Sequence, residues 1–138
     1  MSFQSLPFNQ QENQLFISDG FGKKILVVDD NIATLEIIDL VLTDAGYAVK
    51  QASSVDKAIK ELIKGNVFVL LTDLQLPTIT GWELASLARF YNPNIKVIVL
   101  TGYDSLAKPP NIGLVDLVMS KPIKADLLVE QIDRVALL

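Results

Sequence analysis

Short apolar runs alternate with amphipathic segments along most of this chain. Residues 25–28 are four consecutive apolar residues, and residues 67–72 and 95–100 form two more mostly apolar runs. A short run that is apolar on both faces predicts a strand buried in the middle of a sheet. Residues 47–51 and 114–119 predict two further strands.

Apolar residues recur at helical spacing between these runs. The spacing predicts helices over residues 33–45, 80–91 and 124–137. A further helix is predicted between Ser53, as its N-cap, and Gly65, which ends it. The predicted inward stripe of this helix contains Val55, Ala58, Ile59, Leu62 and Ile63.

Strands that alternate with helices predict right-handed βαβ units and a parallel sheet covered on both faces. Five such units favour an α/β, flavodoxin-like, doubly wound five-stranded sheet of order 2-1-3-4-5. A closed barrel of this kind needs about 250 residues, whereas the chain has 138. In an open sheet the ligand site lies beyond the carboxyl ends of the strands, here between the first and third.

One segment departs from this alternation. The helix before the fifth strand should lie within residues 103–113, but Pro109 and Pro110 stand inside that stretch. Two consecutive prolines are incompatible with a helix interior, and Pro109 disfavours the helical region for Lys108. We therefore expect the fourth helix to be short or missing, with a loop over residues 104–113.

The ends of the chain differ in character. Residues 1–22 are polar and rich in Gln and Asn, so we interpret them as a mobile tail or linker, and residues 23–138 as one folded domain. No apolar run reaches the roughly 18 residues that span a bilayer, and the N-terminus lacks the pattern of a signal peptide. The expected location is the cytoplasm, without membrane insertion.

Composition limits the chemistry. The chain contains no cysteine and no histidine, which excludes disulfides, thiolate chemistry and imidazole bases. Its net charge of −4 argues against direct binding of nucleic acid. Function must therefore rest on carboxylates, hydroxyls and lysines.

Acidic residues follow the two central strands. Asp29 and Asp30 come after the first strand and Asp73 ends the third, while Lys121 follows the fifth. Neighbouring strands lie about 4.8 Å apart, so three carboxylates are brought close together. Because like charges at this distance need a counter-charge, Lys121 and a divalent cation are expected. An all-oxygen, half-open site suits Mg²⁺.

Each residue of this group then has an expected role. Asp73 is the candidate nucleophile, which can carry an aspartyl phosphate. Asp30, and Asp29 through water, would hold Mg²⁺ together with the backbone carbonyl of Gln75. Lys121 would neutralise charge on a transferring phosphoryl group. The hydroxyl of Thr101, at the end of the fourth strand, would donate to a phosphoryl oxygen.

Taken singly, these residues have structural explanations. Asp30 or Asn31 could cap the first helix, and Asp73 could belong to an Asx turn. Thr101 could be an ordinary strand-end hydroxyl and Lys121 an ordinary surface charge. Their combination at one edge of the sheet favours the functional interpretation.

Four motifs in order carry a resemblance to a known family. They are ILVVDDN at 25–31, DLQLP at 73–77 with Gly81 eight residues after Asp73, VIVLTG at 97–102 and MSKP at 119–122. The chain resembles the receiver domain of bacterial response regulators over about residues 23–138.

The resemblance implies that a partner histidine kinase or phosphotransfer protein phosphorylates Asp73, with Mg²⁺ at Asp29 and Asp30. It also implies a switch hydroxyl at Thr101, a phosphate contact by Lys121 and a cis peptide before Pro122. The expected protein is a signalling phosphoacceptor that catalyses only its own phosphorylation and dephosphorylation. It would signal to a downstream output protein or domain.

Two alternatives remain beside this interpretation. The first is a receiver-like scaffold that phosphorylation does not regulate. The second is an aspartyl-nucleophile phosphatase, but Gln75 stands two residues after Asp73, where such enzymes carry a general acid. The chain also has Val118 three residues before Lys121, where the family usually has an aromatic residue, so no aromatic rotamer at this position can report phosphorylation.

Overall fold

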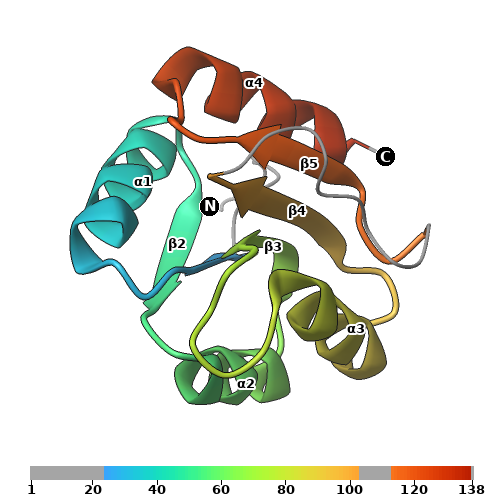
Figure 1. Cartoon of the computed structure of the whole chain (residues 1–138). Helices are drawn as coiled ribbons and strands as arrows, with labels where there is room; N and C mark the ends of the chain where they lie inside the picture. The colour runs from blue at the N-terminus through green and yellow to red at the C-terminus, as the bar shows by residue number, and fades with distance from the viewer. Residues whose placement is uncertain (1–23, 103–112, 138) are drawn as a thin grey trace, which may run out of the picture.

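The computed structural model describes residues 24–102 and 113–137, which contain a central parallel sheet (Figure 1). Its strands are β1 (Lys24–Val28), β2 (Ala48–Ala52), β3 (Val67–Asp73), β4 (Lys96–Thr101) and β5 (Leu117–Ser120). The strand order is β2-β1-β3-β4-β5, and each neighbouring pair is parallel. The predicted flavodoxin-like order is therefore confirmed.

Helices cover both faces of this sheet. They are α1 (Ile32–Asp44), α2 (Val55–Lys64), α3 (Gly81–Tyr91) and α4 (Ala125–Ala136) in the described part of the chain. Helices α1 and α4 pack on one face, and α2 and α3 on the other (Figure 1). The resulting three-layer arrangement is that of a doubly wound α/β fold.

Two hydrophobic cores lie on opposite sides of the sheet. Side chains alternate along β1, so Ile25 and Val27 enter one core while Leu26 and Val28 enter the other. Along β3, Val69 and Leu71 enter the first core and Leu70 enters the second. Because both faces are covered, the central strands are apolar on both faces between their polar end residues, as their sequences predicted.

Helix α2 differs from its prediction in two respects. Its N-cap is Ser54, whose hydroxyl accepts a hydrogen bond from the Lys57 N–H at 3.2 Å, so the assignment of Ser53 was wrong by one residue. Ile63, expected in the inward stripe, is 61% exposed, whereas Glu61 is only 7% exposed. Three lysines that pair with the Glu61 carboxylate allow the acid to replace an apolar residue there.

Strand β5 is shorter than predicted and begins at Leu117 instead of residue 114. The backbone N–H of Asp116 donates to the Val97 carbonyl at 2.8 Å, and its carboxylate accepts from the Val97 N–H at 2.7 Å. The Asp116 carboxylate thus takes the hydrogen bond of the Val97 N–H. This N–H would be needed to pair β4 with a β5 that began earlier in the chain.

Some predictions fall on residues outside the described ranges. The short or missing helix was predicted over residues 104–113, of which only Gly113 is described. The proposed tail or linker at residues 1–22 also lies outside, so the division at residue 23 stays a prediction. No helix within residues 24–102 and 113–137 has the length and apolar character needed to cross a membrane.

Candidate phosphoryl-transfer site

Strands β1 and β3 bring their terminal acids to the same edge of the sheet. Val28 pairs with Thr72, so Asp29 and Asp73 follow at adjacent positions on neighbouring strands. Asp29 is 2% exposed and Asp73 is 9% exposed. Such burial is unusual for carboxyl groups unless they are paired or bind a cation.

The three predicted acids form one cluster. One carboxylate oxygen from each of Asp29, Asp30 and Asp73 lies within 4.8 Å of the other two. The Lys121 ammonium lies 3.1 Å from Asp29 Oδ2 and 3.5 Å from Asp73 Oδ1. The structure therefore brings together the acids and the lysine that the sequence motifs had singled out.

The turn after β1 leaves Asp30 available to a ligand. Asn31 is the N-cap of α1, and its side chain accepts a hydrogen bond from the Thr34 N–H at 3.0 Å. The Asn31 N–H in turn donates to Asp29 Oδ1 at 2.9 Å. The alternative in which Asp30 caps α1 is therefore wrong, and Asp30 stands exposed beside the buried Asp29.

Gly81 holds the loop after β3 against the backbone of the site. Its N–H donates to the Leu74 carbonyl at 2.7 Å. A Cβ atom at this position would lie 2.6 Å from the Asp73 carbonyl oxygen, closer than nonbonded atoms can approach. Glycine is thus required here by space, and helix α3 begins directly beside Asp73.

Thr101 and Lys121 come from the ends of β4 and β5. Thr101 is buried, and its carbonyl accepts a hydrogen bond from the Lys121 N–H at 2.8 Å. The Lys121–Pro122 peptide is cis, as the family resemblance implied. These backbone contacts fix where the Lys121 side chain leaves the sheet.

The surroundings of the site raise the pKa values of both Asp73 and Lys121. Burial raises the pKa of Asp73, and the nearby Asp29 raises it further, although Lys121 and a backbone hydrogen bond from Gln75 act in the opposite direction. Burial alone would lower the pKa of Lys121. Its hydrogen bond to Asp29 and the charges of Asp29 and Asp73 outweigh burial, so the pKa of Lys121 is raised. The lysine stays cationic while Asp73 holds its proton more strongly than an ordinary aspartate.

The residues present fit a divalent cation. Three clustered carboxylates outnumber the single ammonium that lies within 4.0 Å of Asp29 and Asp73 among the described residues. The remaining negative charge and the all-oxygen donor set are what Mg²⁺ prefers. The predicted use of the Gln75 backbone carbonyl as a further ligand stays a prediction.

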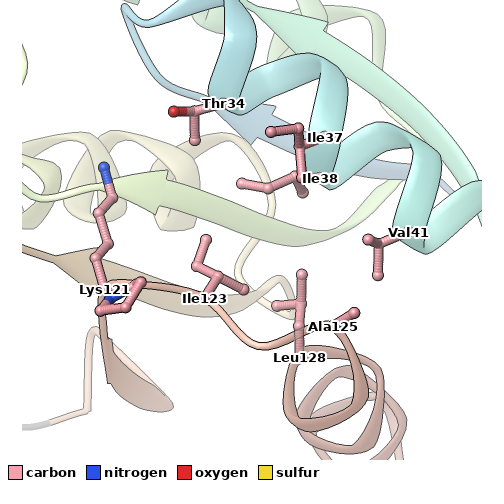
Figure 2. Close-up of a pocket in the computed structure, with 9 residues that line it drawn as sticks. Thr34, Ile37, Ile38, Val41, Lys121, Ile123, Ala125 and Leu128 are labelled. Carbon is pink, nitrogen blue, oxygen red and sulfur yellow. The ribbon is translucent and has the colours of Figure 1, made fainter.

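An apolar groove that sequence reasoning missed adjoins the site. It has a volume of about 270 Å³ and runs between α1 and the segment from β5 into α4. Figure 2 shows Lys121 at one end and Ile37, Val41 and Ile123 along its walls. Ile37 is 62% exposed. The sequence could have pointed to this groove, because Ile37 lies outside the inward stripe of α1 and an apolar residue there has no core to enter.

Sequence comparison identifies the domain type that carries this arrangement. A family model described as "Response regulator receiver domain" matches residues 25–133. The response regulator receiver protein CpdR of Brucella abortus is 30% identical over 114 residues, which cover 81% of this chain and 95% of CpdR. The CAI-1 autoinducer sensor kinase/phosphatase CqsS of Vibrio cholerae is 31% identical over 93 residues, which cover 67% of this chain but 14% of CqsS.

Solved structures show the same architecture. The response regulator protein TrrA of Thermotoga maritima, in complex with Mg²⁺-BeF, has a TM-score of 0.75 and 29% identity, covering 82% of this chain and 98% of TrrA. A response regulator protein of Burkholderia pseudomallei, with a phosphorylated aspartic acid, calcium ion and citrate, has a TM-score of 0.67 and 26% identity. That match covers 81% of this chain and 71% of the Burkholderia chain.

Proposed function

Because the chain belongs to the response regulator receiver domain family, we propose that Asp73 accepts a phosphoryl group in a Mg²⁺-dependent reaction. The phosphorylated domain would change its contacts and so signal to a downstream protein or domain. The observation that carries this proposal is the cluster of Asp29, Asp30 and Asp73, in which Asp29 and Asp73 also contact the Lys121 ammonium. The Mg²⁺-BeF complex of TrrA and the phosphorylated aspartate of the Burkholderia protein support it.

The proposed reaction transfers phosphorus from nitrogen to oxygen. An Asp73 carboxylate oxygen attacks the phosphorus atom of a phosphohistidine, the O–P bond forms, and the P–N bond breaks. The electron pair of that bond returns to the donor's imidazole. Since these 138 residues contain no histidine, the phosphohistidine would come from outside them, from a histidine kinase or a phosphotransfer protein.

The surrounding residues would stabilise the charge that develops on the phosphoryl oxygens. Bound Mg²⁺, held by Asp29, Asp30, Asp73 and the Gln75 carbonyl, would supply positive charge beside the transferring group. The Lys121 ammonium needs only a small shift from Asp73, now 3.5 Å away, to contact a phosphoryl oxygen. The Thr101 hydroxyl would donate to another oxygen and so couple phosphorylation to the end of β4.

The domain would act only on its own phosphoryl group, by accepting it and later allowing water to remove it. A phosphatase with a separate substrate is disfavoured because Gln75 offers no carboxylic acid to protonate a leaving group. A receiver-like scaffold without phosphorylation is the remaining alternative. The predicted cytoplasmic location is also part of this proposal.

The groove between α1 and α4 is a suitable docking surface for the protein donor. It is apolar, it includes the exposed Ile37, and its lining includes Lys121, which touches Asp73. A donor seated there would have its phosphohistidine within reach of the Asp73 carboxylate. A small phosphodonor does not need this surface, so comparing it with a protein donor distinguishes an effect on docking from an effect on the reaction at Asp73.

Phosphorylation can be tested by incubating the chain with Mg²⁺ and a small phosphodonor, followed by intact mass measurement. We expect a gain of one phosphoryl group that disappears with a chelator and in Asp73→Asn. The matched control is Asp44→Asn, an exposed acid at the end of α1 outside the cluster. A chain that gains nothing would favour the scaffold, and a gain that persists in Asp73→Asn would exclude Asp73 as the acceptor.

Docking can be tested separately by comparing a protein phosphodonor with a small one. Ile37→Glu should slow transfer from the protein donor and leave transfer from the small donor unchanged. Leu40→Glu is the matched control, since Leu40 is 71% exposed on the same helix but does not line the groove. Equal effects of the two variants on the protein donor would contradict a docking role for the groove.

A further inference from the structure

A second cavity lies away from the carboxylate cluster and is lined by residues of α2 and of the edge strand β2. It has a volume of about 400 Å³, within the range of small-molecule sites. Its lining consists of Lys50, Gln51, Lys57, Lys60, Glu61, Ile63 and Lys64. Four of these seven residues are lysines, in a chain whose net charge is −4.

The lysines are arranged by the helix. Lys60 follows Lys57 by three residues and Lys64 follows Lys60 by four, which places the three lysines on one stripe of α2. Seven residues of helix span about 10 Å. Lys50 faces the same cavity from β2, so positive charge lies on two walls and extends beyond the size of one monovalent anion.

Glu61 accounts for only part of this charge. It is buried, and Lys24, Lys50 and Lys64 lie 3.6, 4.0 and 3.2 Å from its carboxylate oxygens. Burial alone would raise the pKa of Glu61, but the Lys64 hydrogen bond and the charges of the three lysines lower it. One ionised carboxylate needs one counter-charge, whereas three cations already surround it.

Two further lysines of the cavity, Lys57 and Lys60, do not pair with Glu61. Lys57 Nζ donates to Ser53 Oγ at 3.1 Å, and Lys60 lines the cavity as an exposed side chain. Glu61 Oε1 is buried and lies 3.6 Å from the ammonium of Lys24, which does not line the cavity. The cavity thus carries more positive charge than Glu61 neutralises.

We propose that this lysine-lined cavity binds a small polyanion that carries two or more phosphoryl groups. The phosphoryl groups contact the lysines, whose ammonium groups act as point charges. The exposed Ile63 side chain offers an apolar wall to the rest of the ligand. The site is independent of the proposed phosphorylation of Asp73.

Direct binding of defined probes tests this site. The full chain is titrated by calorimetry with inorganic pyrophosphate and with a nucleoside diphosphate, without divalent cations and at about 0.15 M salt, where the screening length is about 8 Å. We expect saturable binding of both probes, tighter for the nucleoside diphosphate, and no saturable binding of sulfate. Amide chemical shifts should change in α2 and β2.

The decisive variant is Lys57→Gln combined with Lys60→Gln. Neither residue pairs with Glu61, so the ion pairs that hold α2 remain. Loss of two surface charge contacts should weaken probe binding about tenfold. The control, Lys96→Gln combined with Lys124→Gln, makes the same charge change elsewhere and should bind as the wild type does.

Several outcomes would overturn the proposal. They are the absence of saturable binding, equal weakening by both double variants, and sulfate binding as tight as pyrophosphate binding. Vesicles containing anionic phospholipid and an acidic peptide serve as further probes. Binding of either one without binding of the soluble polyanions would assign this surface to a membrane or a protein instead.

Discussion

The Lys121 ammonium donates a hydrogen bond to Asp29 at 3.1 Å and lies farther, at 3.5 Å, from Asp73. The lysine is thus held mainly by the deeply buried acid next to the proposed phosphoacceptor. Asp29 is thus paired, whereas the negative charge of Asp73 is only partly neutralised by Lys121. This agrees with the raised pKa of Asp73. It also keeps the ammonium within a short movement of any group bound to Asp73.

Removal of this ammonium should destabilise the fold. In Lys121→Met at neutral pH without Mg²⁺, we expect the unfolding free energy to fall by about 1–3 kcal/mol. This is less than the cost of breaking a fully buried ion pair, because the Lys121 side chain is partly exposed. The loss should shrink at acidic pH, where the partner carboxylates are protonated. Urea unfolding at both pH values measures it, with the exposed Lys124→Met as control. An equal loss at both pH values would point to packing of the lysine stem instead.

Replacement of the Asp73 carboxyl should have the opposite effect. A carboxyl whose pKa is higher in the folded than in the unfolded state binds more protons when folded. Its contribution to stability therefore falls as pH rises through that interval, and the cost persists at neutral pH. Asp73→Asn should raise the melting temperature at pH 7 in a chelator, and the difference should vanish below the pKa of an unfolded aspartate. A lower melting temperature at pH 7 would contradict the raised pKa of Asp73.

Magnesium should stabilise the folded chain through the same cluster. At a free concentration 100 times its dissociation constant, a ligand that binds only the folded state adds about 2.7 kcal/mol. We expect Mg²⁺ to raise the melting temperature of the wild type but not of Asp30→Asn, in which an exposed ligand is lost without disturbing the core. The fluorescence of Trp82, the single tryptophan and the neighbour of Gly81, offers a second readout. An unchanged Mg²⁺ response in Asp30→Asn would exclude Asp30 as a ligand.

A methyl group at Gly81 should displace the loop after β3. In Gly81→Ala the new Cβ would meet the Asp73 carbonyl oxygen, and overpacking of this kind costs about 1–3 kcal/mol. Phosphorylation from a small donor should slow as well, because the Asp73 backbone must move. The control is Gly102→Ala, since a Cβ there meets nothing within 4 Å. Comparable losses in both variants would argue against a specific contact at Gly81.

The corrected N-cap of α2 predicts a contrast between neighbouring serines. Ser54→Ala removes the acceptor of the Lys57 N–H and should cost about 1 kcal/mol. Ser53→Ala removes only an exposed contact with the Lys57 ammonium, so its effect should stay within about 0.5 kcal/mol. Thermal unfolding of the two variants measures this contrast, and a larger loss in Ser53→Ala would restore the original assignment.

The order of strands and the acidic cluster could be predicted because they depend on chain-wide alternation and on motifs at strand ends. β1 and β3 are apolar on both faces along most of their length, and the parallel topology then carries Asp29 and Asp73 to one edge. No detail of side-chain packing enters that inference. The resemblance to receiver domains added the cis peptide before Pro122, which local sequence alone could not establish.

Features that depend on side-chain pairing were not predicted. Ile63 fitted the inward spacing of α2 by hydrophobicity, but Glu61 takes the buried position because lysines from β1, β2 and α2 neutralise it. Lys24 and Lys50 are distant in sequence from Glu61, so a helical pattern cannot reveal this pairing. The start of β5 was misplaced for a similar reason, since it depends on the contact between Asp116 and Val97.

Because β1 and β3 carry apolar side chains on both faces, the carboxylate cluster is a more sensitive indicator of their register than burial is. A slip of β1 by one residue would exchange its two faces but still bury apolar side chains on both, so burial alone discriminates weakly between the two alignments. The same slip would move Asp29 by about 3.3 Å relative to Asp73 and disperse the cluster. A core variant that stays folded yet no longer binds Mg²⁺ would therefore reveal a misaligned strand, with every ligand residue still intact.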